Sequence, residues 1–248
     1  MNEVTFIQSQ YPEALWLSRS VSKLCLSIGL SSRDAERLNN LMAERIKVRR
    51  GSALYRIGDP LCSIYAVRVG AFKTGIMSVN GHNQILGFQM SGDMLGLEVI
   101  STGYYGCDAV ALEDSEVSSI NYFQLETLAQ DLPAVQHNLS KLLSCEIVRD
   151  RHMMFLMGNL NSKERLAGFL LNLSQQLSVL GNSSTNFVLK MSREDIGSYI
   201  GLRLETICRC IAHFRNHGLA EITGRDVKIL NAEGLRYLIS GLHRNVRD

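Results

Sequence analysis

Several features that would place this chain in other classes of protein are missing from its sequence. No apolar stretch reaches the roughly 18 residues that a membrane-spanning helix needs, and residues 1–11 do not combine a basic segment with an apolar one. We therefore expect a protein that neither spans a membrane nor is secreted. We expect it in the cytoplasm.

Cysteine occurs six times, without the C-x-x-C spacing of a zinc or redox site. Cys208 and Cys210 are too close together for an ordinary tetrahedral zinc pair, so no metal ligand is assigned. A chain of 248 residues with 46% hydrophobic residues can bury its core without disulfides, and two domains are expected. Scattered thiols of this kind fit a reducing compartment, where most of them are small core residues.

The short motifs of catalysis are also missing. The sequence contains no G-x-S-x-G, no H-E-x-x-H, no P-loop and no G-x-G-x-x-G, so we expect a binding protein rather than an enzyme and assign no catalytic residue. The net charge is only +2, but from Asn161 onward the chain has 12 Lys and Arg against 8 Asp and Glu. This mild basic excess permits a nucleic-acid partner without requiring one.

The first half of the chain has the pattern of an antiparallel β-roll. Between Glu44 and Asn121 glycines separate short strand-like runs such as residues 63–69 and 82–88, as is typical of small β-barrels and sandwiches. Asn80-Gly81 is a strong hairpin signal, because both positions tolerate a positive φ. We assign residues 31–131 to a β-roll sensor domain and residues 1–30 to an N-terminal arm.

A long helix is predicted over residues 132–160, because Pro133 marks its start and only Gly158 interrupts the helical pattern. It carries two apolar stripes. The first is a heptad seam that consists of Leu143, Ile147, Asp150, Met154 and Met157. The second consists of Leu139, Leu142, Met153, Leu156 and Leu160. We expect one stripe to pack on the β-roll and the seam to form a dimer; a helix buried within one domain is the alternative.

Residues 161–248 are predicted to form a winged helix-turn-helix domain, which makes the fold class α+β. Asn161 and Glu164 have the spacing of a capping box, and an apolar helical pattern follows to residue 177. After a short strand at residues 187–191, a brief helix from Ser192, a turn at Gly201 and a second helix to Asn216 give the helix-turn-helix pattern. Residues 220–229 are expected to form a hairpin, the wing.

The run GSYIGLRLETICR at residues 197–209 closely resembles the helix-turn-helix of the Crp/FNR superfamily, whose second helix carries an E-T-[IV]-x-R signature. Residues 50–59, 64–70 and 91–96 resemble the FNR branch in order and spacing. The resemblance extends from about Leu24 to the end of the wing. It implies a homodimer that binds palindromic promoter DNA, with half-sites such as TTGAT or TTGAC, and that contacts RNA polymerase as an activator.

Three side chains of the second helix are predicted to read bases. Glu205, Cys208 and Arg209 project from one face of the helix, because they are three and four residues apart. The forked donors of Arg209 match guanine O6 and N7, and Glu205 can accept from a cytosine amino group. The resemblance implies the same roles. Family members commonly carry serine at the position of Cys208, where a thiol is a weaker donor that can still touch a thymine methyl group.

Other residues of this domain have expected supporting roles. Leu204 and Ile207 are assigned to packing or backbone fit. DNA phosphates are expected to be contacted by basic and hydroxyl side chains, with a merely solvated surface as the alternative; these residues are Arg193, Arg203, Thr206, Arg215 and Lys228.

The resemblance also shows which sensor chemistry this chain has lost. FNR proteins hold a [4Fe–4S] cluster through three N-terminal cysteines and one in the β-roll, but here only Cys25 remains, and the other positions fall at Trp16, Arg19 and Ser118. One thiolate cannot hold a cluster that needs four ligands, so no cluster is expected. Rearranged ligands are the alternative, with the candidates Cys62, Cys107 and Cys145.

Cyclic AMP is not expected either. The cyclic-nucleotide branch grips the phosphate with an Arg-Ser pair, and the matching positions here are Cys107-Asp108, whose carboxylate repels a phosphate. The alternative to a regulator without a cofactor is a sensor whose main activity is signal binding. Such a sensor would use haem through His82, thiol redox chemistry through Cys25 or Cys107, or an unknown small molecule.

Overall fold

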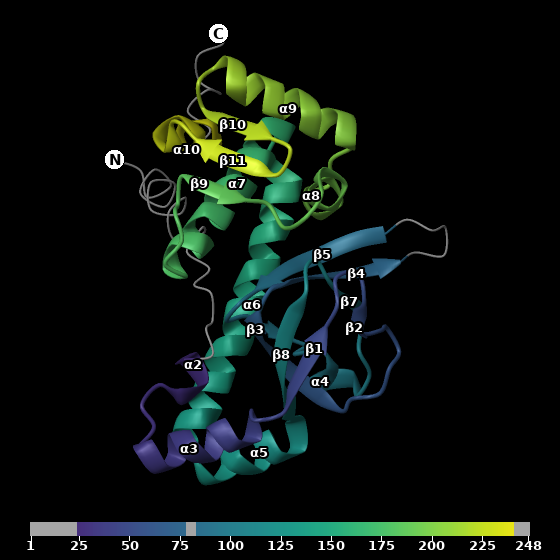
Figure 1. The fold of residues 1–248 in the computed structure, drawn as a ribbon, viewed down its shortest axis with the longest axis vertical. Coiled ribbons are helices and arrows are strands. Elements are labelled where there is room, and N and C mark those ends of the chain that lie inside the picture. The colour runs from purple at the N-terminus through teal and green to yellow at the C-terminus, as the bar shows by residue number, and fades with distance from the viewer. Residues whose placement is uncertain (1–23, 78–82, 241–248) are drawn as a thin grey trace. The chain divides into compact units, whose positions relative to one another are not determined.

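A computed structural model describes residues 24–77 and 83–240, which fall into two compact units (Figure 1). Along the chain, the boundary between the units falls between Glu146 and Ile147, inside the long helix α6 (Pro133–Asn159). The first part of α6 therefore belongs to the N-terminal unit and its last part to the C-terminal unit. Among the described helices, none combines the length and the apolarity that crossing a membrane requires.

The N-terminal unit contains two four-stranded antiparallel sheets, which confirms the predicted β-roll. The first sheet has the order β1 (Arg45–Val48), β8 (Ser115–Asn121), β3 (Ser63–Val69) and β6 (Met94–Leu95). The second has the order β2 (Ala53–Tyr55), β7 (Asp108–Ala111), β4 (Ala71–Met77) and β5 (Asn83–Met90). The helices of this unit, besides α6, are α2 (Leu24–Ser27), α3 (Ser32–Leu41), α4 (Val99–Thr102) and α5 (Tyr122–Asp131).

The turn between β3 and β4 shows why glycine is needed there. Gly70 has φ +94°, and a Cβ atom at this position would lie 2.1 Å from Ser115 Oγ. Both the conformation and the space exclude a side chain. The other predicted turn, Asn80-Gly81, lies outside the described residues, although β4 and β5 pair antiparallel on either side of it.

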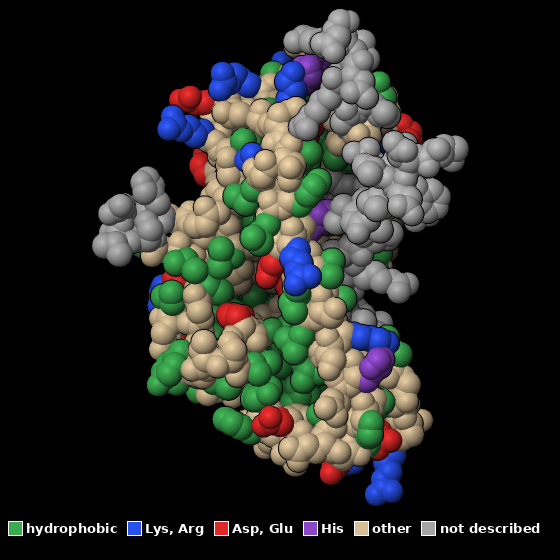
Figure 2. Space-filling model, turned by 180° about the vertical axis from the view of Figure 1, so that it is seen from behind, with side chains coloured by type: hydrophobic (Ala, Val, Ile, Leu, Met, Phe, Trp, Pro, Cys, Tyr) green, Lys and Arg blue, Asp and Glu red, His purple; other side chains and the backbone are tan. Residues whose placement is uncertain are grey.

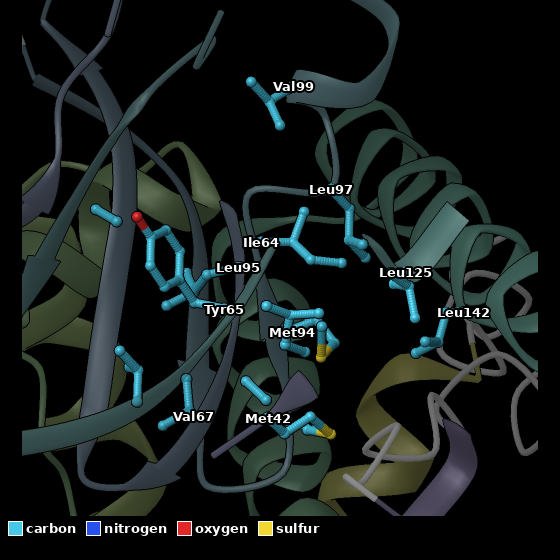
Figure 3. Close-up of a cluster of buried hydrophobic side chains, with 14 of the residues drawn as sticks. Met42, Ile64, Tyr65, Val67, Met94, Leu95, Leu97, Val99, Leu125 and Leu142 are labelled. Atoms are coloured by element: carbon cyan, nitrogen blue, oxygen red, sulfur yellow. The ribbon is translucent and has the colours of Figure 1, made fainter. Parts of the chain in front are cut away.

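The core of the N-terminal unit joins both sheets to helices α5 and α6. Ile64, Leu95 and Leu125 are fully buried in it, and Leu142 of α6 reaches the same cluster (Figure 3). Leu139 packs against this core as well, so the second apolar stripe begins on the β-roll, as predicted. Leu143 differs from its prediction in part, because this residue of the predicted dimer seam also packs against the core and is half-buried.

The C-terminal unit is a winged helix-turn-helix, as predicted. Its helices, besides the end of α6, are α7 (Ser162–Val179), α8 (Arg193–Ile200), α9 (Leu204–Asn216) and α10 (Ala232–Ile239). Its three-stranded sheet has the order β10 (Ala220–Thr223), β11 (Asp226–Ile229) and β9 (Asn186–Val188). β9 is shorter than the predicted strand at residues 187–191, because its pairing with β11 ends at Val188.

Local caps set the helix boundaries of this unit. Asn161 and Glu164 form a complete capping box at the start of α7, and Ser192 and Asp195 form another at the start of α8. α8 ends at Gly201, whose left-handed conformation (φ 66°, ψ 41°) lets the chain turn directly into α9. The second helix of the predicted helix-turn-helix, α9, therefore begins shortly after the predicted turn at Gly201.

Candidate nucleic-acid interface

Helix α9 has one buried face and one exposed face. Ile207, Cys210 and Phe214 are buried and anchor the helix to the core of the unit. The predicted base-reading residues lie on the other face, where their side chains are exposed; these are Glu205, Cys208 and Arg209. This geometry leaves a carboxylate, a thiol and a guanidinium together at the surface of the second helix of a helix-turn-helix.

Two arginines already make contacts on this exposed face. Arg209 Nη2 donates to Thr206 Oγ1 at 3.3 Å, so the guanidinium lies along its own helix. Arg193, at the start of α8, places Nη1 3.8 Å from Cys208 Sγ. Arg193 was predicted as a phosphate contact; the structure brings it beside the predicted base-reading face, where its positive charge adjoins the thiol.

The remaining predicted phosphate contacts lie around the same face. Arg203 is the exposed N-cap of α9 and makes no side-chain capping bond, so the helix begins with an arginine beside its positive dipole end. Arg215 is exposed on α9, and Lys228 is exposed on the wing strand β11. Lys and Arg side chains project from the part of the C-terminal unit that carries α9 (Figure 2). A polyanion approaching α9 would meet positive charge on helix and wing.

The two apolar residues of α9 that were assigned to packing or backbone fit differ in burial. Ile207 is fully buried, as expected, but Leu204 has 40% of its surface exposed. Leu204 is the first residue of the helix, where the core does not reach it. Its side chain is therefore exposed to solvent at the N-terminal end of α9, next to Glu205.

The sensor positions of the β-roll hold polar contacts rather than a ligand set. Ser118 is fully buried on β8, and Arg68 Nη1 lies 3.2 Å from its hydroxyl while Arg68 Nε lies 3.7 Å from the Glu116 carboxylate. In the described ranges, no three His, Cys, Asp or Glu side chains gather in a way that could hold a metal ion. Trp16, Arg19, His82 and the side chain of Cys25 lie outside the described part of the chain.

Cys107 has the surroundings of an unreactive thiol. It is buried, and Sγ lies 3.4 Å from Glu98 Oε1. Burial first, and then the Glu98 charge, raise the pKa of this thiol to about 12. Since the thiolate is the form that reacts, the described geometry disfavours Cys107 as a redox sensor.

Asp108 follows Cys107 in the pair that aligns with the Arg-Ser pair of cyclic-nucleotide proteins. It has a structural role. Its Oδ1 accepts from the Ile57 amide at 2.8 Å, and its Oδ2 lies 3.4 Å from Arg56 Nη1. Next to it, the rings of Tyr55 and Tyr105 stack with centroids 3.9 Å apart. The two positions aligned with the Arg-Ser pair of the cyclic-nucleotide branch therefore hold a buried thiol and a carboxylate that bonds within the β-roll.

Taken together, the β-roll, the long helix and the exposed face of α9 define a winged-helix DNA-binding protein with a sensor-type domain. Residues 45–131 match the cyclic nucleotide-binding domain family, and residues 164–238 match the family of Crp-like helix-turn-helix domains. The chain belongs to the Crp/FNR family and is a DNA-binding transcription regulator.

Relatives of known identity support this assignment. The transcriptional regulatory protein btr of Bordetella pertussis is 42% identical over 216 residues, which cover 87% of this chain and 89% of btr. The fumarate and nitrate reduction regulatory protein of Escherichia coli K12 is 36% identical over 227 residues, 92% of this chain and 90% of that protein. The structure of FixK2 from Bradyrhizobium japonicum covers 79% of this chain and 96% of FixK2, with 29% identity and a TM-score of 0.72. The two curated relatives are named as regulatory proteins, not as enzymes.

Proposed function

We propose that this regulator acts in the cytoplasm as a homodimer on a palindromic promoter site of the FNR type, where it activates transcription by contacting RNA polymerase. The observation that carries the proposal is the exposed face of α9, with Glu205, Cys208 and Arg209 side by side. Glu205 and Arg209 match the donor and acceptor pattern of a C·G pair in the major groove. Similarity to fumarate and nitrate reduction regulators supports a related half-site.

Selection of bound duplexes from a random library tests this function. We expect an inverted repeat of half-sites like TTGAT or TTGAC, with the base pair nearest Cys208 less strictly selected because a thiol is a weak donor. Transcription from a promoter that carries the selected site, with purified RNA polymerase, tests activation. Recovery of no symmetric motif would contradict the proposal.

The apolar surface of α6 supports the dimer. Ile147 and Met154 have 51% and 73% of their surfaces exposed in the single chain, and Val148 and Phe155 beside them are also exposed. Hydrophobic side chains are visible at the surface of the molecule in Figure 2. When a second copy covers large apolar side chains that a helix leaves in water, the burial stabilises the dimer. We assign Ile147 and Met154 to the seam of a two-fold coiled coil, with Val148 and Phe155 beside it.

Asp150 weakens that seam in our proposal. It is exposed between Ile147 and Met154, and in a parallel pair it would face its own copy. Removing two like charges from an apolar contact should strengthen association, so we expect Asp150→Ala to tighten the dimer. Sedimentation equilibrium of wild type and variant measures this. An unchanged or weaker dimer would show that Asp150 turns away from the partner, toward the adjacent arginines.

We further propose that the protein carries no [4Fe–4S] cluster and binds no cyclic AMP. Of the positions that hold the cluster in FNR proteins, Ser118 is a buried serine contacted by Arg68. Protein purified without oxygen should be colourless and free of stoichiometric iron and labile sulfide. Iron and sulfide in the expected ratio, with the broad visible absorbance of a cluster, would favour a rearranged set of cysteines instead.

A further inference from the structure

Arg165, in the first turn of α7, contacts three backbone carbonyls of the C-terminal unit. Its Nε donates to Leu160 O at 2.8 Å, its Nη2 to Met157 O at 2.6 Å and its Nη1 to Ile200 O at 3.3 Å. Met157 lies in the last turn of α6, and Ile200 is the last residue of α8. A single guanidinium therefore joins the end of α6 to the end of α8, the first helix of the helix-turn-helix.

The chemistry of these partners explains why arginine suits the position. The last carbonyls of a helix have no partner within the helix and carry the negative end of its dipole. A guanidinium offers several N–H donors in a fixed plane, so it can satisfy carbonyls that point from different directions. Lysine has its donors on one nitrogen and cannot span the same three acceptors in this arrangement.

The turn of the helix-turn-helix lies directly on this junction. A Cβ atom added to Gly201 would lie 3.1 Å from Met157 Cε and 3.4 Å from Arg165 Nη1. The turn that leads into α9 therefore lies close to the end of α6 and to the arginine, which holds it through Ile200 O. Any change in the direction of α6 against α8 would have to break these contacts.

We infer that Arg165 is a positioning residue that holds the recognition helix at a fixed angle to α6, and that it thereby sets the distance between the two half-sites that the dimer accepts. The inference rests on the proposed function, because only a dimer joined through α6 converts this angle into a spacing. Arg165 need not touch a base to have this effect. Its role is to let both recognition helices of the dimer bind their half-sites at the same time.

The expected consequence follows from the geometry of DNA. Each base pair inserted at the dyad moves one half-site by about 3.4 Å and turns it by about a tenth of a helical turn. A rigid dimer loses one of its two contacts on such a site, whereas a loosely joined dimer can follow it. Rigid joining of two binding modules raises affinity by about 10²–10⁴ over a single module, and this gain is what Arg165 would protect.

The experiment uses the full chain and four duplexes: the selected palindrome, the same half-sites with one and with two extra base pairs at the dyad, and a single half-site. Fluorescence anisotropy gives the Kd of each protein for each of the four duplexes. The proteins are wild type, Arg165→Met, Arg165→Lys and Lys163→Met. Lys163→Met is the matched control, because it removes the same charge from the same turn of α7 and is two residues from Arg165. Circular dichroism and thermal unfolding establish that each variant is folded.

We expect Arg165→Met to bind the selected palindrome about tenfold more weakly or worse, to bind the single half-site within about twofold of wild type, and to discriminate little between the spacings. Arg165→Lys should show palindrome affinity and spacing discrimination between those of wild type and Arg165→Met. It replaces Arg165→Met in the test if that variant does not fold. Lys163→Met should keep the wild-type discrimination. Undiminished spacing discrimination in folded Arg165 variants would overturn the inference alone, whereas wild type without preference for any palindrome would overturn the proposed function.

Discussion

Replacing Arg209 with alanine is expected to cost about 1–3 kcal/mol of binding free energy at the selected palindrome, and to remove the preference for guanine at one position of each half-site. The guanidinium is exposed on α9 and, within the described part of the chain, is held by a 3.3 Å contact to Thr206, which it can exchange for a base. The loss should be confined to cognate DNA, because the contact that disappears carries sequence information.

Arg215→Ala is the matched comparison, because Arg215 is an exposed arginine of the same helix. We expect it to weaken binding to all sequences alike and to reduce the dependence of affinity on salt by about one phosphate contact. Repeating the library selection with each variant, and measuring Kd at several salt concentrations, separates the two effects. Recovery of the same guanine preference by Arg209→Ala would refute the base-reading assignment.

Replacing Ile147 with glutamate is expected to dissociate the dimer. In a two-fold parallel seam the new carboxylate would face its own copy, and burying an unpaired charge costs about 3 kcal/mol or more. Dissociation should therefore become at least about 100-fold easier. Since the palindrome needs both subunits, we expect its affinity to approach that of a single half-site.

Val179→Glu is the control for this prediction. Val179 is an apolar residue at the end of α7 that has 61% of its surface exposed, and it lies outside the proposed seam. Sedimentation velocity over a range of concentrations should show monomers for Ile147→Glu and dimers for Val179→Glu. A dimer that survives Ile147→Glu would exclude this face of α6 as the interface.

The sequence alone predicted the elements whose signals are local. Strand β3 at residues 63–69 follows from its strand-like composition between turn glycines, and the start of α7 follows from a capping box whose two members are three residues apart. The exposed face of α9 follows from helical spacing. Each of these signals depends on neighbours within one or two turns of the chain, so a single sequence contains them completely.

Packing between distant segments was decided only by the tertiary structure. Leu143 is half-buried because it meets the core of the β-roll, and the raised pKa of the Cys107 thiol results from burial beside Glu98. Arg165 could not be recognised from spacing, since its acceptors are backbone carbonyls, which every residue has, and one of them is 35 residues away. No pattern of side chains encodes such a contact; it exists only where the ends of two helices converge on one guanidinium.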